Sequence, residues 1–150
     1  MILTEKECGL LKDMKAQEEL CIRKYNKYAE EAKSPKLSEL FTNMAKIEGS
    51  HLCTINGLLE GNEPECPKPI SADNTLCERY EYSSPEDRKL DAFLCQDMLS
   101  MEKHVSSVYN TGVFEFKSPA ARKMLNHIQA EEQQHGEWLY AYMEANGTYA

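Results

Sequence analysis

The chain has 150 residues, of which 41% are hydrophobic and 28% are charged, and its formal net charge is −8. This length is enough for one buried core, and no apolar run approaches the roughly 18 residues that a membrane span needs. The negative charge repels phosphate backbones and no basic patch offsets it, which excludes a role with nucleic acid. We expect a single domain over residues 1–150 in the cytoplasm, because residues 1–7 begin a charged helical pattern instead of an export signal.

Four helices are predicted from the signals that start and stop them. The expected ranges, in chain order, are residues 4–32, 35–60, 85–116 and 119–145. At each start a Ser or Thr side chain can cap free backbone N–H groups, and three of these residues precede a proline that suits the first helical position. The four capping residues are Thr4, Ser34, Ser84 and Ser118. Asn62 after Gly61, and Gly147 after Asn146, follow the second and fourth helices as stop signals.

Residues 61–84 contain three prolines and no sustained apolar period, which indicates a connection between helices. The short junctions on either side make the first and last helix pairs antiparallel hairpins. A link of about 24 residues can span up to about 80 Å, whereas the second helix is only about 38 Å long, so the chain can return along the whole bundle. The predicted fold is all-α, a four-helix bundle of ferritin-like topology with one long crossover.

The two predicted hairpins repeat one sequence pattern at a spacing of 84 residues. The superposed pairs are Glu18 with Glu102, Tyr25 with Tyr109, Glu48 with Glu132, and His51 with His135. The same shift superposes the Lys-Ser-Pro turn at residues 33–35 on the one at 117–119. A Glu three residues before a His can arise by chance, but chance does not also align the turns. We infer that the hairpins are copies related by a pseudo-twofold axis.

Helical periodicity places the repeated Glu and His residues on the apolar faces of their helices. Glu18 shares its face with Met14 and Cys21, whereas Glu19 does not. Glu18 and Glu48 each lie about 15 residues from the first turn, or roughly 20 Å along the helix, and the same holds in the second hairpin. The side chains should meet at one height inside the bundle. The other two histidines, His104 and His127, fall outside these faces and are expected at the surface.

Four carboxylates in an apolar interior would each lose hydration at a cost of several kcal/mol, which two divalent cations would offset. The alternative is that neighbouring Lys, Arg or Tyr side chains satisfy them. We favour the metal site, and mixed carboxylate and imidazole ligands suit iron, or alternatively manganese. The six predicted ligands are Glu18, Glu48, His51, Glu102, Glu132 and His135. Tyr25 and Tyr109 lie two turns beyond Glu18 and Glu102. They either donate hydrogen bonds to the ligands of the site or only pack against it.

These residues resemble those of the rubrerythrin and ferritin-like superfamily over nearly the whole chain, the connection excepted. In that superfamily two helices each supply a Glu and two each supply a Glu-x-x-His motif. The resemblance implies two iron ions bridged by Glu48 and Glu132, with Glu18 and Glu102 as terminal ligands. It also implies a peroxidase, although Val105 stands where rubrerythrins have a further carboxylate and no rubredoxin module is present.

Residues 21–29 and 126–136 look still closer to the CotF-like spore coat proteins of spore-forming Firmicutes. The two resemblances imply different functions. One is an oxidoreductase that acts on peroxide or dioxygen with an unknown electron donor, in oxidative-stress defence. The other is a structural protein of the spore coat in which the metals only brace the bundle. Coat proteins or a second copy of the chain would be its partners.

The six cysteines include no Cys-x-x-Cys pair, which argues against a zinc ribbon or a rubredoxin-type site. Cys21 and Cys95 lie on apolar helix faces and are expected to be core thiols. Cys66 and Cys77 lie in the connection, where a disulfide and two free thiols are both compatible with the sequence.

Overall fold

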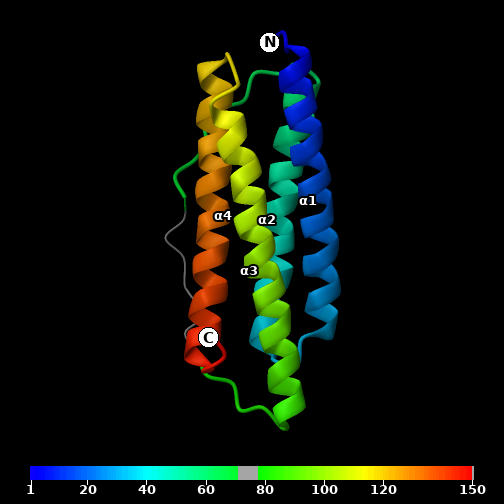
Figure 1. Ribbon diagram of the computed structural model, residues 1–150, viewed down its shortest axis with the longest axis vertical. Helices are drawn as coiled ribbons and strands as arrows, with labels where there is room; N and C mark the ends of the chain where they lie inside the picture. The colour runs from blue at the N-terminus through cyan, green and yellow to red at the C-terminus, as the bar shows by residue number, and fades with distance from the viewer. Residues whose placement is uncertain (71–77, 150) are drawn as a thin grey trace.

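A computed structural model describes residues 1–70 and 78–149. This part of the chain contains four helices and no strand (Figure 1), which confirms the predicted all-α four-helix bundle. The helices are α1 (Glu5–Glu31), α2 (Pro35–Leu59), α3 (Pro85–Val113) and α4 (Pro119–Ala145). Within the same described residues, no helix combines the length and the apolar character that crossing a membrane would require.

The predicted capping residues are confirmed at all four helix starts. Thr4 and Glu7 form a reciprocal capping box, and the hydroxyl groups of Ser34, Ser84 and Ser118 each accept a backbone N–H three residues on. Gly61, with φ of 84°, and Gly147, with φ of 64°, follow α2 and α4 in the left-handed region, which glycine adopts without steric cost. Local side-chain chemistry therefore sets most helix ends.

The third helix ends earlier than the sequence pattern predicts, at Val113 instead of residue 116. The backbone turns at Phe114, and the N–H groups of Glu115 and Phe116 both donate to the carbonyl of Gly112. This turn carries the Phe116 ring into the core, where it is 3% exposed. Burial of an aromatic side chain thus outweighs the extra helical turn.

The helices pair as two antiparallel hairpins, with α1 packed on α2 and α3 on α4. The hairpins meet through α1 against α3 and, less extensively, α2 against α4. Figure 1 shows that α2 ends at one end of the bundle and α3 begins at the other, so these helices run in the same direction. The connection between them spans the bundle length, as expected for one crossover. Residues 71–77 of that connection, including Cys77, lie outside the described residues.

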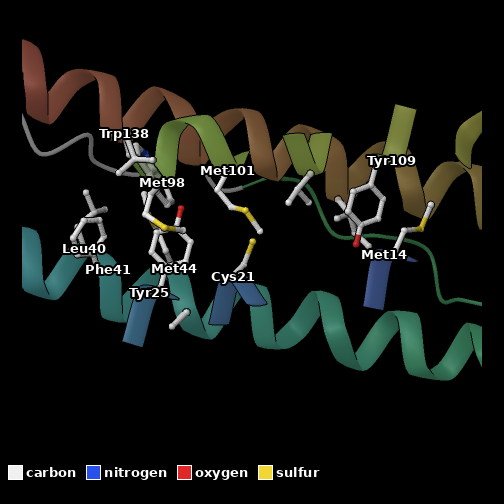
Figure 2. Close-up of a cluster of buried hydrophobic side chains, with 14 of the residues drawn as sticks. Met14, Cys21, Tyr25, Leu40, Phe41, Met44, Met98, Met101, Tyr109 and Trp138 are labelled. Carbon is white, nitrogen blue, oxygen red and sulfur yellow. The ribbon is translucent and has the colours of Figure 1, made fainter. Parts of the chain in front are cut away.

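Large apolar side chains fill the space between the hairpins. Figure 2 shows Met14 beside Tyr109 and, further along the bundle, Cys21 beside Met101. A Cβ atom at Gly112 would lie 2.3 Å from the Met14 methyl group, so the glycine lets α1 and α3 approach closely here. Cys21 and Cys95 are both 0% exposed, which agrees with their expected place in the core.

Two buried carboxylates tie the start of each hairpin to the turn of the other. Glu7 Oε1 accepts the backbone N–H of Lys117 at 2.8 Å, in the α3–α4 turn. Asp91 accepts the backbone N–H groups of Lys33 at 2.8 Å and Ser34 at 2.9 Å, in the α1–α2 turn. Glu7 and Asp91 are also 84 residues apart, so the repeat includes these contacts. Sequence reasoning missed them because they join separate hairpins.

Candidate metal centre

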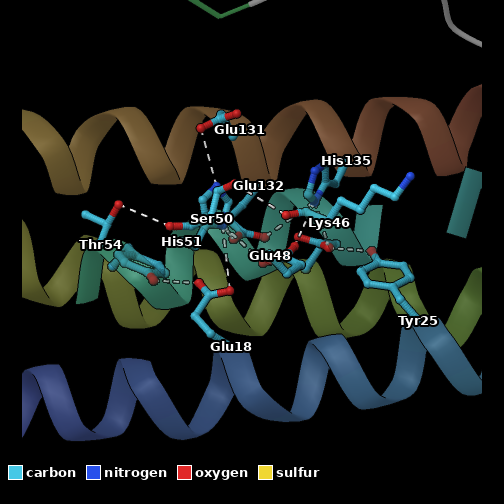
Figure 3. A network of polar contacts seen from close by, with 12 residues as sticks. Glu18, Tyr25, Lys46, Glu48, Ser50, His51, Thr54, Glu131, Glu132 and His135 are labelled. Carbon is cyan, nitrogen blue, oxygen red and sulfur yellow. Dashed lines mark hydrogen bonds and ion pairs between the residues drawn. The ribbon is translucent and has the colours of Figure 1, made fainter. Parts of the chain in front are cut away.

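The six predicted ligands lie together inside the bundle, each at most 2% exposed. Their ligand atoms form two overlapping groups, in each of which all atoms lie within 4.8 Å of one another. The first group is Glu18, Glu48, His51 and Glu132, and the second is Glu48, Glu102, Glu132 and His135. Glu48 and Glu132 belong to both groups, which is the position that a bridging ligand would need. Figure 3 shows Glu18, Glu48, His51, Glu132 and His135 converging from α1, α2 and α4. Glu102 adds a ligand from α3.

Both imidazole rings direct Nδ1 toward the carboxylates. His51 Nδ1 lies 2.9 Å from Glu132 Oε1 and 3.1 Å from Glu48 Oε2. His135 Nδ1 lies 2.8 Å from Glu48 Oε1 and 3.2 Å from Glu102 Oε1. The Glu-x-x-His spacing accounts for the contact of His51 with Glu48, because residues three apart on a helix project side by side. The other three contacts join different helices.

The buried carboxylates differ in how strongly they hold protons. Burial and the neighbouring Glu48 carboxylate raise the pKa of Glu18 to about 8. Burial and nearby carboxylates also raise the pKa of Glu132 well above its usual value. Burial opposes ionisation of Glu48 too, but hydrogen bonds from Glu18, His135 and His51 outweigh it and hold its pKa well below the usual value. Without metal, the cluster therefore limits its charge by keeping some carboxyl groups protonated.

The two histidines are held in the charged form by the same neighbours. Burial alone would lower the pKa of His51, but hydrogen bonds to Glu131 and Glu132 raise it well above its usual value. Burial is likewise outweighed at His135, whose contact with Glu102 raises its pKa to about 9. Metal ions would have to displace these protons, because metal ligands bind in their deprotonated forms.

Several buried polar atoms of the cluster have no hydrogen-bond partner. Whether metal ions fit the site depends on whether they could satisfy these atoms. These atoms are Glu18 Oε2, Glu102 Oε2, Glu132 Oε2 and His135 Nε2, whereas Glu132 Oε1 lies 2.9 Å from His51 Nδ1. Buried polar atoms in folded proteins nearly always have partners, so such a concentration needs an explanation. Among the described residues no lysine or arginine forms an ion pair with the six. Divalent cations would satisfy the orphaned carboxylate oxygens, so the residues present fit the metal site that the sequence predicts.

Two tyrosines reach the cluster crosswise between the hairpins. The hydroxyl group of Tyr25, on α1, donates to Glu102 on α3. The hydroxyl group of Tyr109, on α3, donates to Glu18 on α1 at 2.5 Å. Both tyrosines are 0% exposed, and the two contacts are equivalent in the 84-residue repeat. The tyrosines therefore hold the two non-bridging carboxylates in place, although their role toward a metal stays a prediction.

One polar contact at the cluster was missed by sequence reasoning. His51 Nε2 lies 3.4 Å from Glu131 Oε1, and the same oxygen lies 2.8 Å from His127 Nε2. Burial opposes ionisation of Glu131, but its contact with His51 outweighs burial and lowers the pKa of the carboxyl group. His127, which is expected at the surface, is partly buried, since its side chain is 19% exposed and contacts Glu131 on the same helix. The available signal was the spacing of His127 and Glu131, four residues apart on one helix face.

The fold and this cluster define a helical bundle with an interior carboxylate and histidine site. Residues 90–150 match the family model of the Coat F domain. The matched segment contains most of α3 and all of α4, with Glu102, Glu132 and His135. No curated protein and no solved structure matches the chain. The resemblance to the CotF-like coat proteins is thus supported for the second hairpin, and the one to rubrerythrins stays a prediction.

Proposed function

We propose that this chain is a metal-binding protein of the spore coat, in which two divalent ions join four helices into one rigid bundle. The observation that carries the metal site is the pair of overlapping ligand groups, which draw on all four helices. The Coat F match over residues 90–150 supports the place in the coat and suggests other coat proteins as partners.

The bracing role follows from where the ligands are attached. The two groups share Glu48 on α2 and Glu132 on α4, so either ion would bind both hairpins at once. An ion that binds the folded chain and not the unfolded one stabilises the fold by an amount that grows with the logarithm of the ratio of its free concentration to its dissociation constant. The ions would also offset the mutual repulsion of carboxylates that burial otherwise leaves unfavourable.

The donor set favours iron or manganese as the bound metal. Oxygen and imidazole ligands suit these ions, whereas zinc and copper sites often use thiolates. Cys21 lies near the cluster, but burial and the surrounding carboxylates raise the pKa of its thiol, so it remains protonated. Within the described chain no cysteine belongs to either ligand group.

A second candidate function is reduction of peroxide or dioxygen, and one feature favours it. A groove of about 490 Å³ between α3 and α4 is lined by Glu102 and Glu132, so it reaches the ligands from the surface. Gly136 also lines this groove and adds no side chain to fill it. Bound iron would supply the electrons, while Tyr25 would keep Glu102 oriented beside the groove. The electron donor for such a reaction is unknown.

Metal analysis of the protein purified from its own host tests the principal proposal. We expect two ions per chain, and a chain that binds none under metal-replete conditions would overturn it. Peroxide consumption by the iron-loaded protein then separates the candidates. Turnover that Glu102→Ala abolishes would favour the oxidoreductase, whereas full metal content without turnover would leave the bracing role.

A further inference from the structure

A second pocket, separate from the α3–α4 groove, approaches the candidate metal centre between α2 and α4. It has a volume of about 540 Å³ and lies between α2, α4 and the start of the connection. His51 and Glu131 line it, so its inner end is the His51 side of the ligand cluster. Three carboxylates, of Glu63, Glu65 and Glu131, line it and outnumber the two positive groups, the Lys68 amine and the His51 imidazole. A pocket lined mainly by one sign of charge concentrates ions of the opposite sign.

A chain of ligand-type atoms runs inward from this pocket. His127, which also lines it, contacts Glu131 through Nε2 at 2.8 Å. The same Glu131 oxygen lies 3.4 Å from His51 Nε2. The other nitrogen of that ring, Nδ1, lies 2.9 Å from Glu132 inside the cluster. A cation held by His127 and Glu131 would therefore be one imidazole ring away from the interior ligands.

Comparison of the two halves of the repeat shows that the His127–Glu131 pair occurs in the second half only. In the 84-residue repeat, Asn43 is the sequence equivalent of His127, and Ile47 is the equivalent of Glu131. Neither counterpart offers a charged or imidazole ligand. Thr54, which lines the pocket, has Trp138 as its equivalent in the other half of the repeat. The indole ring of Trp138 lies 5.6 Å from the His135 ring, so the corresponding side of His135 is covered.

We propose that His127 and Glu131 form a transit site for divalent cations, through which metal ions reach the interior ligands by way of the α2–α4 pocket. This inference rests on the proposed metal-binding function and adds the route by which the centre is loaded. The carboxylate of Glu131 and the imidazole of His127 bind the incoming ion weakly, because they supply only two protein ligands. The ion then passes to the interior ligands along the side of the cluster where His51 lies between Glu131 and Glu132.

The test measures how fast cobalt(II) loads into the metal-free full-length protein, by stopped-flow absorbance, together with the number of ions bound at equilibrium. One variant combines His127→Asn with Glu131→Gln, and a second, Thr54→Trp, fills the pocket as Trp138 does on the other side. The matched control combines His104→Asn with Glu137→Gln, at exposed positions outside both pockets. Ser106→Trp instead obstructs the α3–α4 groove, which Ser106 lines.

We expect the wild type and every variant to bind two cobalt ions at equilibrium. The His127/Glu131 variant and Thr54→Trp should load about tenfold more slowly or worse, while the control and Ser106→Trp load at the wild-type rate. Unchanged loading in the His127/Glu131 variant would overturn the transit site, as would slow loading in Ser106→Trp alone. A lower final stoichiometry in the His127/Glu131 variant would also overturn it, since these residues would then be permanent ligands. If Thr54→Trp does not fold, the His127/Glu131 variant decides. A wild type that binds no cobalt would instead refute the metal centre itself.

Discussion

The two halves of the candidate metal centre share their ligands but differ in what surrounds them. On one side His51 directs its outer nitrogen to Glu131 and so to a charged pocket. On the other side His135 Nε2 is buried without a hydrogen-bond partner, and its ring packs beside Trp138. A duplicated hairpin has therefore kept its ligands at both positions and changed their surroundings at one. The six candidate ligands are common to both halves, and the residues around them differ in how they connect the cluster to solvent.

The largest effect on metal content is expected from a ligand that both halves of the centre share. Glu48→Ala removes a ligand common to both groups, so both ions should be lost. Glu18→Ala removes a ligand of one group only and should leave one ion bound. Elemental analysis after loading with manganese measures both outcomes, with Glu19→Ala as the exposed control that keeps two ions. Retention of two ions by Glu48→Ala would show that the halves bind independently of this carboxylate.

Metal removal should affect the whole bundle, because each ion is expected to join both hairpins. At a free metal concentration about 100 times the dissociation constant, each bound ion stabilises the fold by about 2.7 kcal/mol, so two ions contribute about 5 kcal/mol. For a chain of this size the loss of both corresponds to a decrease of roughly 10 to 20 °C in Tm on chelation. Differential scanning calorimetry with and without chelator measures it. An unchanged Tm in a protein shown to lose its metal would contradict the bracing role.

The crosswise tyrosines allow the halves to be compared directly. Tyr25→Phe and Tyr109→Phe each remove one hydrogen bond to a buried carboxylate, at Glu102 and Glu18 respectively. Each should destabilise the metal-free protein by about 1 to 3 kcal/mol, the usual range for a buried acceptor that loses its partner. Chemical denaturation of the metal-free variants gives the two values. A difference greater than about 1 kcal/mol between them would show that the halves are unequal here as well.

The smallest effect concerns Glu7, far from the metal centre. Burial opposes its ionisation, but backbone N–H groups of Thr4 and Lys117 outweigh burial and lower its pKa. Its contribution to stability is therefore present above the unfolded-state pKa, near 4.3, and is lost as pH falls through the lower folded-state pKa. Glu7→Gln should cost about 1 to 2 kcal/mol at neutral pH and progressively less below about pH 4. Thermal unfolding of both proteins across this range is the measurement, and a constant difference would contradict it.

Much of the fold follows from the sequence because its signals are local. Thr4, Ser34, Ser84 and Ser118 act on backbone within one turn of themselves, and helical periodicity alone places Glu18 and His51 inward. The end of α3 was predicted wrongly because burial of Phe116 is a tertiary effect. The contact of Glu131 with His51 joins two helices, so neither helix pattern reveals it. The repeat itself held an unused signal, since positions where the copies differ, such as Thr54 and Trp138, mark the place where the halves have diverged.

The paired contacts of Glu7 and Asp91 bear on how the chain acquires its structure during synthesis. The first hairpin leaves the ribosome before Asp91 does, so the backbone N–H groups of Lys33 and Ser34 then lack the acceptor that they have in the finished fold. Glu7 is made early but finds Lys117 only after most of the chain has been translated. Each turn is thus completed by a residue of the other half. The turn of each hairpin therefore gains its full set of hydrogen bonds only when the other hairpin is present.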